Sequence, residues 1–139
     1  MAKTFEDGLL PVTLYADADL SSYQYYAARA GSVLDYANVA NGGSDPGPIG
    51  IIQTDDADTV GDAVSIKTRG FTKAVVAACT TGGAACDIDF GHYLVAGSDG
   101  KLYYAACGLA NARAWGLLSS GSAIINIDWL GSACAYSAS

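Results

Sequence analysis

Ala63-Val64-Ser65-Ile66-Lys67-Thr68-Arg69-Gly70 is the stretch that decides the fold, because apolar Val64 and Ile66 alternate with polar Ser65 and Lys67. Side chains along a β-strand point to opposite faces in turn, so this period of two predicts a strand with one buried face. A shift of one residue would turn the apolar set toward solvent, which fixes the register of the strand against its neighbours.

The second half of the chain repeats this pattern at Ala123-Ile124-Ile125-Asn126-Ile127-Asp128-Trp129-Leu130-Gly131, where we expect Ile125 and Ile127 to point inward. Each half begins with a tyrosine-bearing hairpin, followed by an x-Gly-apolar-apolar strand, a turn, the alternating strand and a glycine. The segments that carry this order are 23–36, 49–54, 55–62 and 63–70 in the first half, and 91–105, 113–120 and 123–131 in the second, at offsets of about 61 to 68 residues.

This duplicated order predicts an all-β chain, a small β-barrel or β-tulip-like domain built from two similar halves. Thirteen of the 14 acidic residues are Asp, which favours turns over helix interiors. The Ala-rich segment 105–113 is the one place where we expect helix, of one or two turns at most, because Gly108 interrupts it.

Length and composition narrow the class of protein. The chain has 139 residues, 51% of them apolar and 15% charged, which fits one folded domain and excludes intrinsic disorder. Apolar runs are too short to span a bilayer, and residues 1–7 lack the apolar core of a secretory signal, so we expect a soluble chain. Its seven basic residues are scattered against a net charge of −7, which argues against nucleic-acid and membrane partners.

Residues that could carry chemistry are few. His92 is the single histidine, so a zinc site of several histidines is excluded, and we interpret it as structural. The Asp-rich segment 55–62 lacks the spacing of a calcium loop and is interpreted as a solvated turn. Asp87 and Asp89 form a second acidic cluster that is considered for calcium in the same way. Asp pairs on adjacent strands leave glycosidase acids as a weaker alternative. We therefore predict no catalytic, cofactor-binding or metal-binding residues, and no enzyme activity.

The cysteines and the tyrosine row each leave two interpretations open. Cys79 and Cys86 bracket a short Gly-rich loop that a disulfide could close, whereas the alternative is that all four cysteines are free thiols. A row of four tyrosines serves either the core of the sheet or an interface: Tyr23, Tyr25, Tyr26 and Tyr36.

We divide the chain into an N-terminal arm at 1–17, a β-rich domain at 18–131 and a C-terminal tail at 132–139. The arm has apolar side chains without a period that would pack them on their own domain, so we expect it to add a strand to a neighbouring subunit. Its expected contact residues are Lys3, Thr4, Phe5, Leu9, Leu10 and Val12. The alternative is that residues 9–15 form an ordinary first strand of the domain.

The ordered set of segments 18–26, 48–53, 63–70, 91–101 and 115–127 resembles a family of tailed-phage capsid decoration (cement) proteins. In that family a "dLSs-qyy" start precedes a "piGvlq" strand, an alternating strand and a "Gd-l-a-sdGka" hairpin. The resemblance implies a β-barrel or β-tulip domain, made in the host cytoplasm and bound as a homotrimer to the outer surface of a viral head. There it would bridge major capsid proteins at threefold or quasi-threefold positions, with the arm as the capsid contact.

A carbohydrate-binding or adhesin-like β-sandwich module is the second interpretation of the sequence. It would use Trp115, Trp129 and the tyrosines as platforms for sugar rings. A decoration protein needs no catalytic group or cofactor, and neither does a sugar-binding module.

Overall fold

A computed structural model describes residues 11–42, 47–78, 87–106 and 108–135, and the side chains of 132–135 are not described. In these residues the chain is all-β, as predicted, and contains no helix. Its ten strands are β1 (Val12–Ala16), β2 (Ala27–Ala30), β3 (Tyr36–Val39), β4 (Pro48–Ile52), β5 (Ala63–Lys67), β6 (Gly70–Ala77), β7 (Tyr93–Ala96), β8 (Leu102–Tyr104), β9 (Gly108–Ala114) and β10 (Ser122–Ala135).

The first five strands close into a barrel in the order β1-β3-β2-β4-β5, with β5 pairing back to β1. The pair β1 and β3 is parallel and the other pairs are antiparallel. The interior is filled by small and branched side chains, as the narrow diameter of a five-stranded barrel requires. Its fully or almost fully buried members are Ala16, Leu20, Ala28, Ala37, Ile52, Ala57, Val64 and Ile66.

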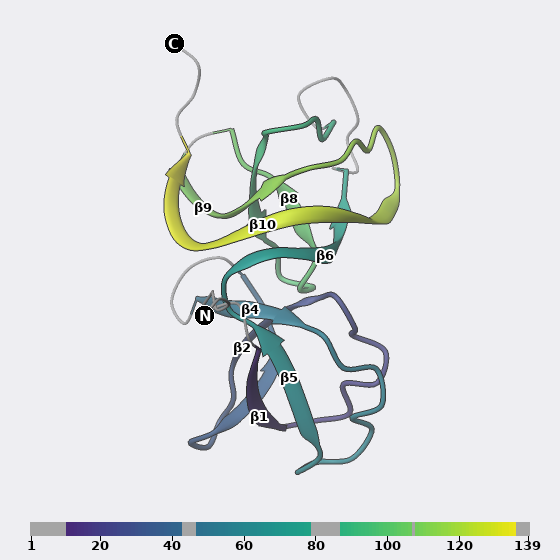
Figure 1. The fold of residues 1–139 in the computed structure, drawn as a ribbon, viewed down its shortest axis with the longest axis vertical. Helices are drawn as coiled ribbons and strands as arrows, with labels where there is room; N and C mark the ends of the chain where they lie inside the picture. The colour runs from purple at the N-terminus through teal and green to yellow at the C-terminus, as the bar shows by residue number, and fades with distance from the viewer. Residues whose placement is uncertain (1–10, 43–46, 79–86, 107, 136–139) are drawn as a thin grey trace, which may run out of the picture.

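The last five strands close into a second barrel with the same topology, β6-β8-β7-β9-β10. Here β6 and β8 are the parallel pair, and β10 pairs back to β6. Figure 1 shows the two barrels stacked along the long axis of the molecule, with β6 running between them. The predicted duplication is therefore present, and each half closes on itself.

Strand registers make the two barrels equivalent residue by residue. Ile66 and Ile127 hold corresponding places, since Ile66 pairs with Ile52 in the first barrel and Ile127 with Ala114 in the second. The backbone hydrogen bonds agree with this correspondence. Gln53 N–H donates to Ser65 O at 2.8 Å, and Trp115 N–H donates to Asn126 O at 2.9 Å.

Backbone conformation supports the same equivalence. Tyr25 and Asp35 are the non-glycine residues with positive φ, both at 70°, in the described chain. Their counterparts by register are Gly91 and Gly100, with φ of 83° and 82°. The fold therefore requires the left-handed conformation at these two positions of each barrel. The second barrel has glycine at both positions, whereas the first has Tyr25 and Asp35.

Of the four side chains expected to point inward, Val64, Ile66 and Ile127 are fully buried. Ile125 is half-buried and packs against the core of the second barrel. The alternating pattern thus predicted both closing strands and their buried faces.

Three expectations need correction. Segment 105–113 contains no helical turn; its second part is strand β9. The strand expected at 113–120 lies earlier, so Gly50 corresponds to Ala112 and not to Gly116. The division of the chain placed Val12–Ala16 in the arm, but these residues form strand β1 of the first barrel, paired with β5 and β3. For them the alternative prediction, an ordinary first strand of the domain, is the correct one.

The two barrels are joined by direct contacts. Val75 N–H donates to Tyr25 O at 2.9 Å, and Ala27 N–H donates to Gly100 O at 2.8 Å. Outward-facing residues of the first barrel enter the core cluster of the second, namely Ala27, Ala40 and Ile51. The core cluster of the second barrel therefore extends across the junction to the outside of the first barrel.

Candidate binding surface

Large apolar side chains gather on the outside of the second barrel, on β6, β10 and the loop after β9. Phe71 is 62% exposed, Trp115 50% and Ile124 54%. Residues at alternate positions of β10 point outward, so Ile124 and Asn126 share this outer side. We call Phe71, Trp115 and Ile124 the outer face.

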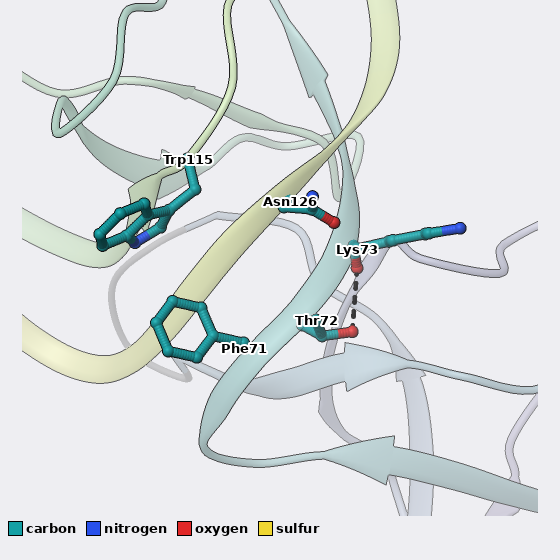
Figure 2. A pocket seen from close by; sticks show the side chains of 5 residues that line it. All are labelled: Phe71, Thr72, Lys73, Trp115 and Asn126. Atoms are coloured by element: carbon teal, nitrogen blue, oxygen red, sulfur yellow. Dashed lines mark hydrogen bonds between the residues drawn. The ribbon is translucent and has the colours of Figure 1, made fainter.

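Phe71 and Trp115 border an open recess of about 450 Å³. Their ring centroids are 5.6 Å apart with planes at 72°, an edge-to-face pair. Figure 2 shows the two rings side by side, with Asn126 beside them and the Lys73 side chain directed away from the rings. Neither the Lys73 ammonium nor the Asn126 amide has a hydrogen-bond partner in the described part of the chain, so both are available to a ligand.

The first barrel shows that the fold does not require these aromatic residues. By strand register, Phe71, Trp115 and Ile124 correspond to Pro11, Gln53 and Ala63. A five-stranded barrel of this topology therefore forms with small or polar residues at the same places. The apolar outer face is a property of the second barrel alone, and a function that needs it is the simplest explanation.

His92 has the structural role expected from the sequence. Its ring stacks on Tyr104 with centroids 4.4 Å apart, and its Nδ1 accepts a hydrogen bond from Asp89 N–H at 3.1 Å. Within the described ranges, no group of three or more His, Cys, Asp or Glu side chains lies close enough to hold a metal ion. Nor does that part of the chain contain a helix long and apolar enough to cross a membrane.

The aspartates mostly support turns. Asp62 accepts a hydrogen bond from Thr59 N–H at 3.1 Å inside the acidic segment 55–62. Asp19 accepts bonds from the hydroxyl and the N–H of Ser21, and these bonds lower the pKa of its carboxyl. Asp87 and Asp89 border a separate recess that is otherwise lined by Ile88, two leucines and two serines.

One tyrosine has a clearly shifted pKa. The Tyr103 hydroxyl donates to Asp99 at 2.7 Å, and this bond to a carboxylate, together with partial burial, raises the pKa of Tyr103 to about 12. The pair closes the β7–β8 turn, so we interpret it as structural.

The tyrosine row is half-buried and serves packing. Tyr23 and Tyr26 form an edge-to-face pair at 5.0 Å, and Tyr25 packs against the core of the second barrel. Trp129, proposed as a sugar platform, is 1% exposed, so that prediction is wrong for Trp129. Trp115 keeps an exposed ring.

Several predicted site residues lie outside the described residues: Lys3, Thr4, Phe5, Leu9, Leu10, Cys79 and Cys86. Val12 is described and is 44% exposed at the start of β1. Phe71 and Ile124 were not singled out in the sequence, because their exposure depends on which strands close the barrel.

Comparison with protein-family models and with curated proteins found no match to this chain.

Proposed function

We propose that this chain is a structural capsid decoration protein, without enzymatic activity, which binds the outer surface of a viral head as a homotrimer at threefold or quasi-threefold positions and bridges major capsid proteins. The observation that carries the proposal is the outer face. Exposed aromatic and branched side chains that the fold does not require are typical of a surface that another protein covers.

Further support comes from the architecture and the sequence. Two closed barrels joined by hydrogen bonds and apolar contacts are suited to bridging neighbouring subunits. The ordered resemblance to decoration proteins extends over both barrels, from the segment 18–26 to the alternating strand at 123–127. The recess beside Trp115 has one ionisable side chain, Lys73, whereas acid–base catalysis requires convergent ionisable groups.

Co-sedimentation with expanded, undecorated heads of the virus that carries the gene tests the proposal. We expect Phe71→Ser and Ile124→Ser to reduce affinity by roughly tenfold or more each, because central apolar contacts typically contribute above 1 kcal/mol. Val60→Ser is the matched control, since Val60 is equally exposed in the turn before β5. Equal binding of all four proteins would contradict the proposed contact face, and absence of binding by the unmodified chain would contradict the function.

Deletion of residues 2–10 tests the arm separately. The shortened chain keeps β1 and both barrels, so we expect it to fold and to occupy fewer sites on the heads. Full occupancy by the shortened chain would show that the arm is not the capsid contact.

Carbohydrate binding is the second candidate function, favoured by the Phe71–Trp115 recess. A sugar ring can stack on Trp115 while the Asn126 amide beside it binds a hydroxyl group. Titration with oligosaccharides would then change the fluorescence of exposed Trp115, and Trp115→Ala would abolish the change although buried Trp129 remains. Saccharide binding without head binding would favour this function over decoration.

A further inference from the structure

We propose that copies of this chain associate head to tail, through unoccupied counterparts of the two surfaces that join the barrels within one molecule. The inference rests on the internal repeat and does not depend on the proposed capsid role. It identifies the partner as a second copy of this chain and names the residues that meet.

The junction inside the molecule defines two surfaces. Surface A lies on the first barrel and surface B on the second. Four hydrogen bonds connect them. Two are those from Val75 and Ala27 described above, and two join Gln53 and Thr72, from Gln53 Nε2 to Thr72 Oγ1 at 3.0 Å and from Thr72 Oγ1 to Gln53 Oε1 at 3.4 Å. Gly100 of surface B also lies so close to Val39 that a Cβ there would overlap the valine. Surface A comprises Tyr25, Ala27, Val39, Ile51 and Gln53, and surface B comprises Thr72, Val75 and Gly100.

Because the barrels are equivalent, each surface has a counterpart that the described part of the chain leaves uncovered. Strand register and the matching backbone bonds assign these counterparts. Surface A′ on the second barrel comprises Gly91, Tyr93, Tyr104, Arg113 and Trp115. Surface B′ on the first barrel comprises Val12, Tyr15 and Asp35.

Both counterparts have the character of unpartnered interfaces. Tyr15 of surface B′ is exposed, and the adjoining β2–β3 turn presents Val33 and Leu34, the latter 85% exposed. Surface A′ exposes Trp115 and Arg113, with the guanidinium 5.4 Å from the centre of the Tyr93 ring. Large exposed apolar side chains next to aromatic and arginine residues are characteristic of protein contact surfaces.

Charge complementarity favours a second copy over another partner. Inside the molecule, Ala27 pairs with Ile51 and donates to Gly100, so Ile51 and Gly100 lie beside the same residue. The counterparts of Ile51 and Gly100 are Arg113 and Asp35. The counterpart surfaces thus have a positive and a negative side chain where the junction has an isoleucine and a glycine. These opposite charges would meet across the contact between copies.

The contact between copies must rest mainly on side chains. Inside the molecule, Val75 N–H donates to Tyr25 O across the junction, but the counterparts of both groups already have partners. Tyr15 N–H, which corresponds to Val75 N–H, donates to Asp35 O, and Gly91 O, which corresponds to Tyr25 O, accepts from Arg113 Nε. Surfaces A′ and B′ differ, so the contact is heterologous, and successive copies form a closed ring or an open chain according to the rotation between them.

Variants that block one surface each test this directly. Leu34→Arg places a positive charge next to B′, where it would repel Arg113 of the neighbouring copy, and Arg113→Glu reverses the charge of A′; both side chains are exposed, so folding should be retained. Val60→Glu is the control on an exposed apolar side chain outside both surfaces. Sedimentation equilibrium over a wide concentration range gives the mass of each species, with thermal melts to compare folding.

We expect the unmodified chain and Val60→Glu to form species larger than the 14.1 kDa monomer, and each blocked variant alone to stay monomeric. An equimolar mixture of the two blocked variants should form dimers, because one intact A′ meets one intact B′. A monomeric unmodified chain, self-association of either blocked variant, or a mixture of folded variants that stays monomeric would overturn the inference. Head binding by a monomeric blocked variant would separate this result from the capsid proposal.

Discussion

Replacement of Asn111 by alanine should destabilise the second barrel by an amount that its hydrogen bonds determine. Asn111 is fully buried on β9. Its Oδ1 accepts from Ala96 N–H at 3.0 Å, and its Nδ2 donates to Gly131 O at 2.9 Å. Gly131 lies where the register of β10 against β9 shifts, so the amide ties this irregular segment of β10 to β7.

Asn111→Ala leaves a buried donor, Ala96 N–H, and a partly buried acceptor, Gly131 O, without partners. A fully buried group costs about 1–3 kcal/mol and a partly buried one less, so we expect the free energy of unfolding to fall by about 2–5 kcal/mol. A chain of this length loses roughly 4 °C of melting temperature per kcal/mol. Asn126→Ala is the matched control, because that amide is exposed and should change stability by less than about 0.5 kcal/mol.

Urea denaturation followed by the fluorescence of Trp129 measures this loss, since Trp129 is buried in the same barrel. The midpoint should shift for Asn111→Ala and stay in place for Asn126→Ala. A change below about 0.5 kcal/mol for Asn111→Ala would refute the reasoning that this amide stabilises the irregular part of β10.

Three further predictions follow from other parts of the molecule. Gly97→Ala should destabilise the β7–β8 turn, measured as a lower melting temperature, because a Cβ there would overlap the Tyr103 ring. Absorbance near 295 nm should show one tyrosine ionising near pH 12, and Tyr103→Phe should remove that step. Because the pKa of Tyr103 is raised in the folded chain, its bond to Asp99 stabilises the fold below pH 10, and this stabilisation is lost as the pH rises toward 12. If Cys79 and Cys86 form a disulfide, mass spectrometry without reductant will find at most two free thiols, whereas four would exclude the bridge.

The alternating strands at 63–67 and 122–130 could be predicted because a period of two determines both the strand and its buried face. The internal repeat could also be recognised in the sequence. For the x-Gly strand, however, the sequence did not show which residue of one half corresponds to which residue of the other. Gly50 and Gly116 have similar local sequences, yet backbone pairing matches Gly50 with Ala112. Local sequence does not contain that information, because pairing is set by distant strands.

The Ala-rich segment 105–113 was ambiguous for a related reason. Alanine has a high helix propensity, but Ala110, Ala112 and Ala114 are fully buried in a narrow barrel where small side chains fit. Tertiary packing therefore overrides propensity there.

The candidate surface was the least predictable part. Both tryptophans looked alike in the sequence, yet Trp129 points into the barrel on β10 and Trp115 lies outside, beyond the end of β9. Which of them is available to a partner depends on how the strands close, and only the folded chain reveals it.

An electron-microscopy map of heads from the virus that carries the gene tests the central proposal most directly. The proposal predicts density for paired five-stranded barrels on the outer surface, at threefold or quasi-threefold positions, with Phe71 and Ile124 covered by the major capsid protein. Mature heads without this density, or barrels whose outer face points to solvent, would contradict it.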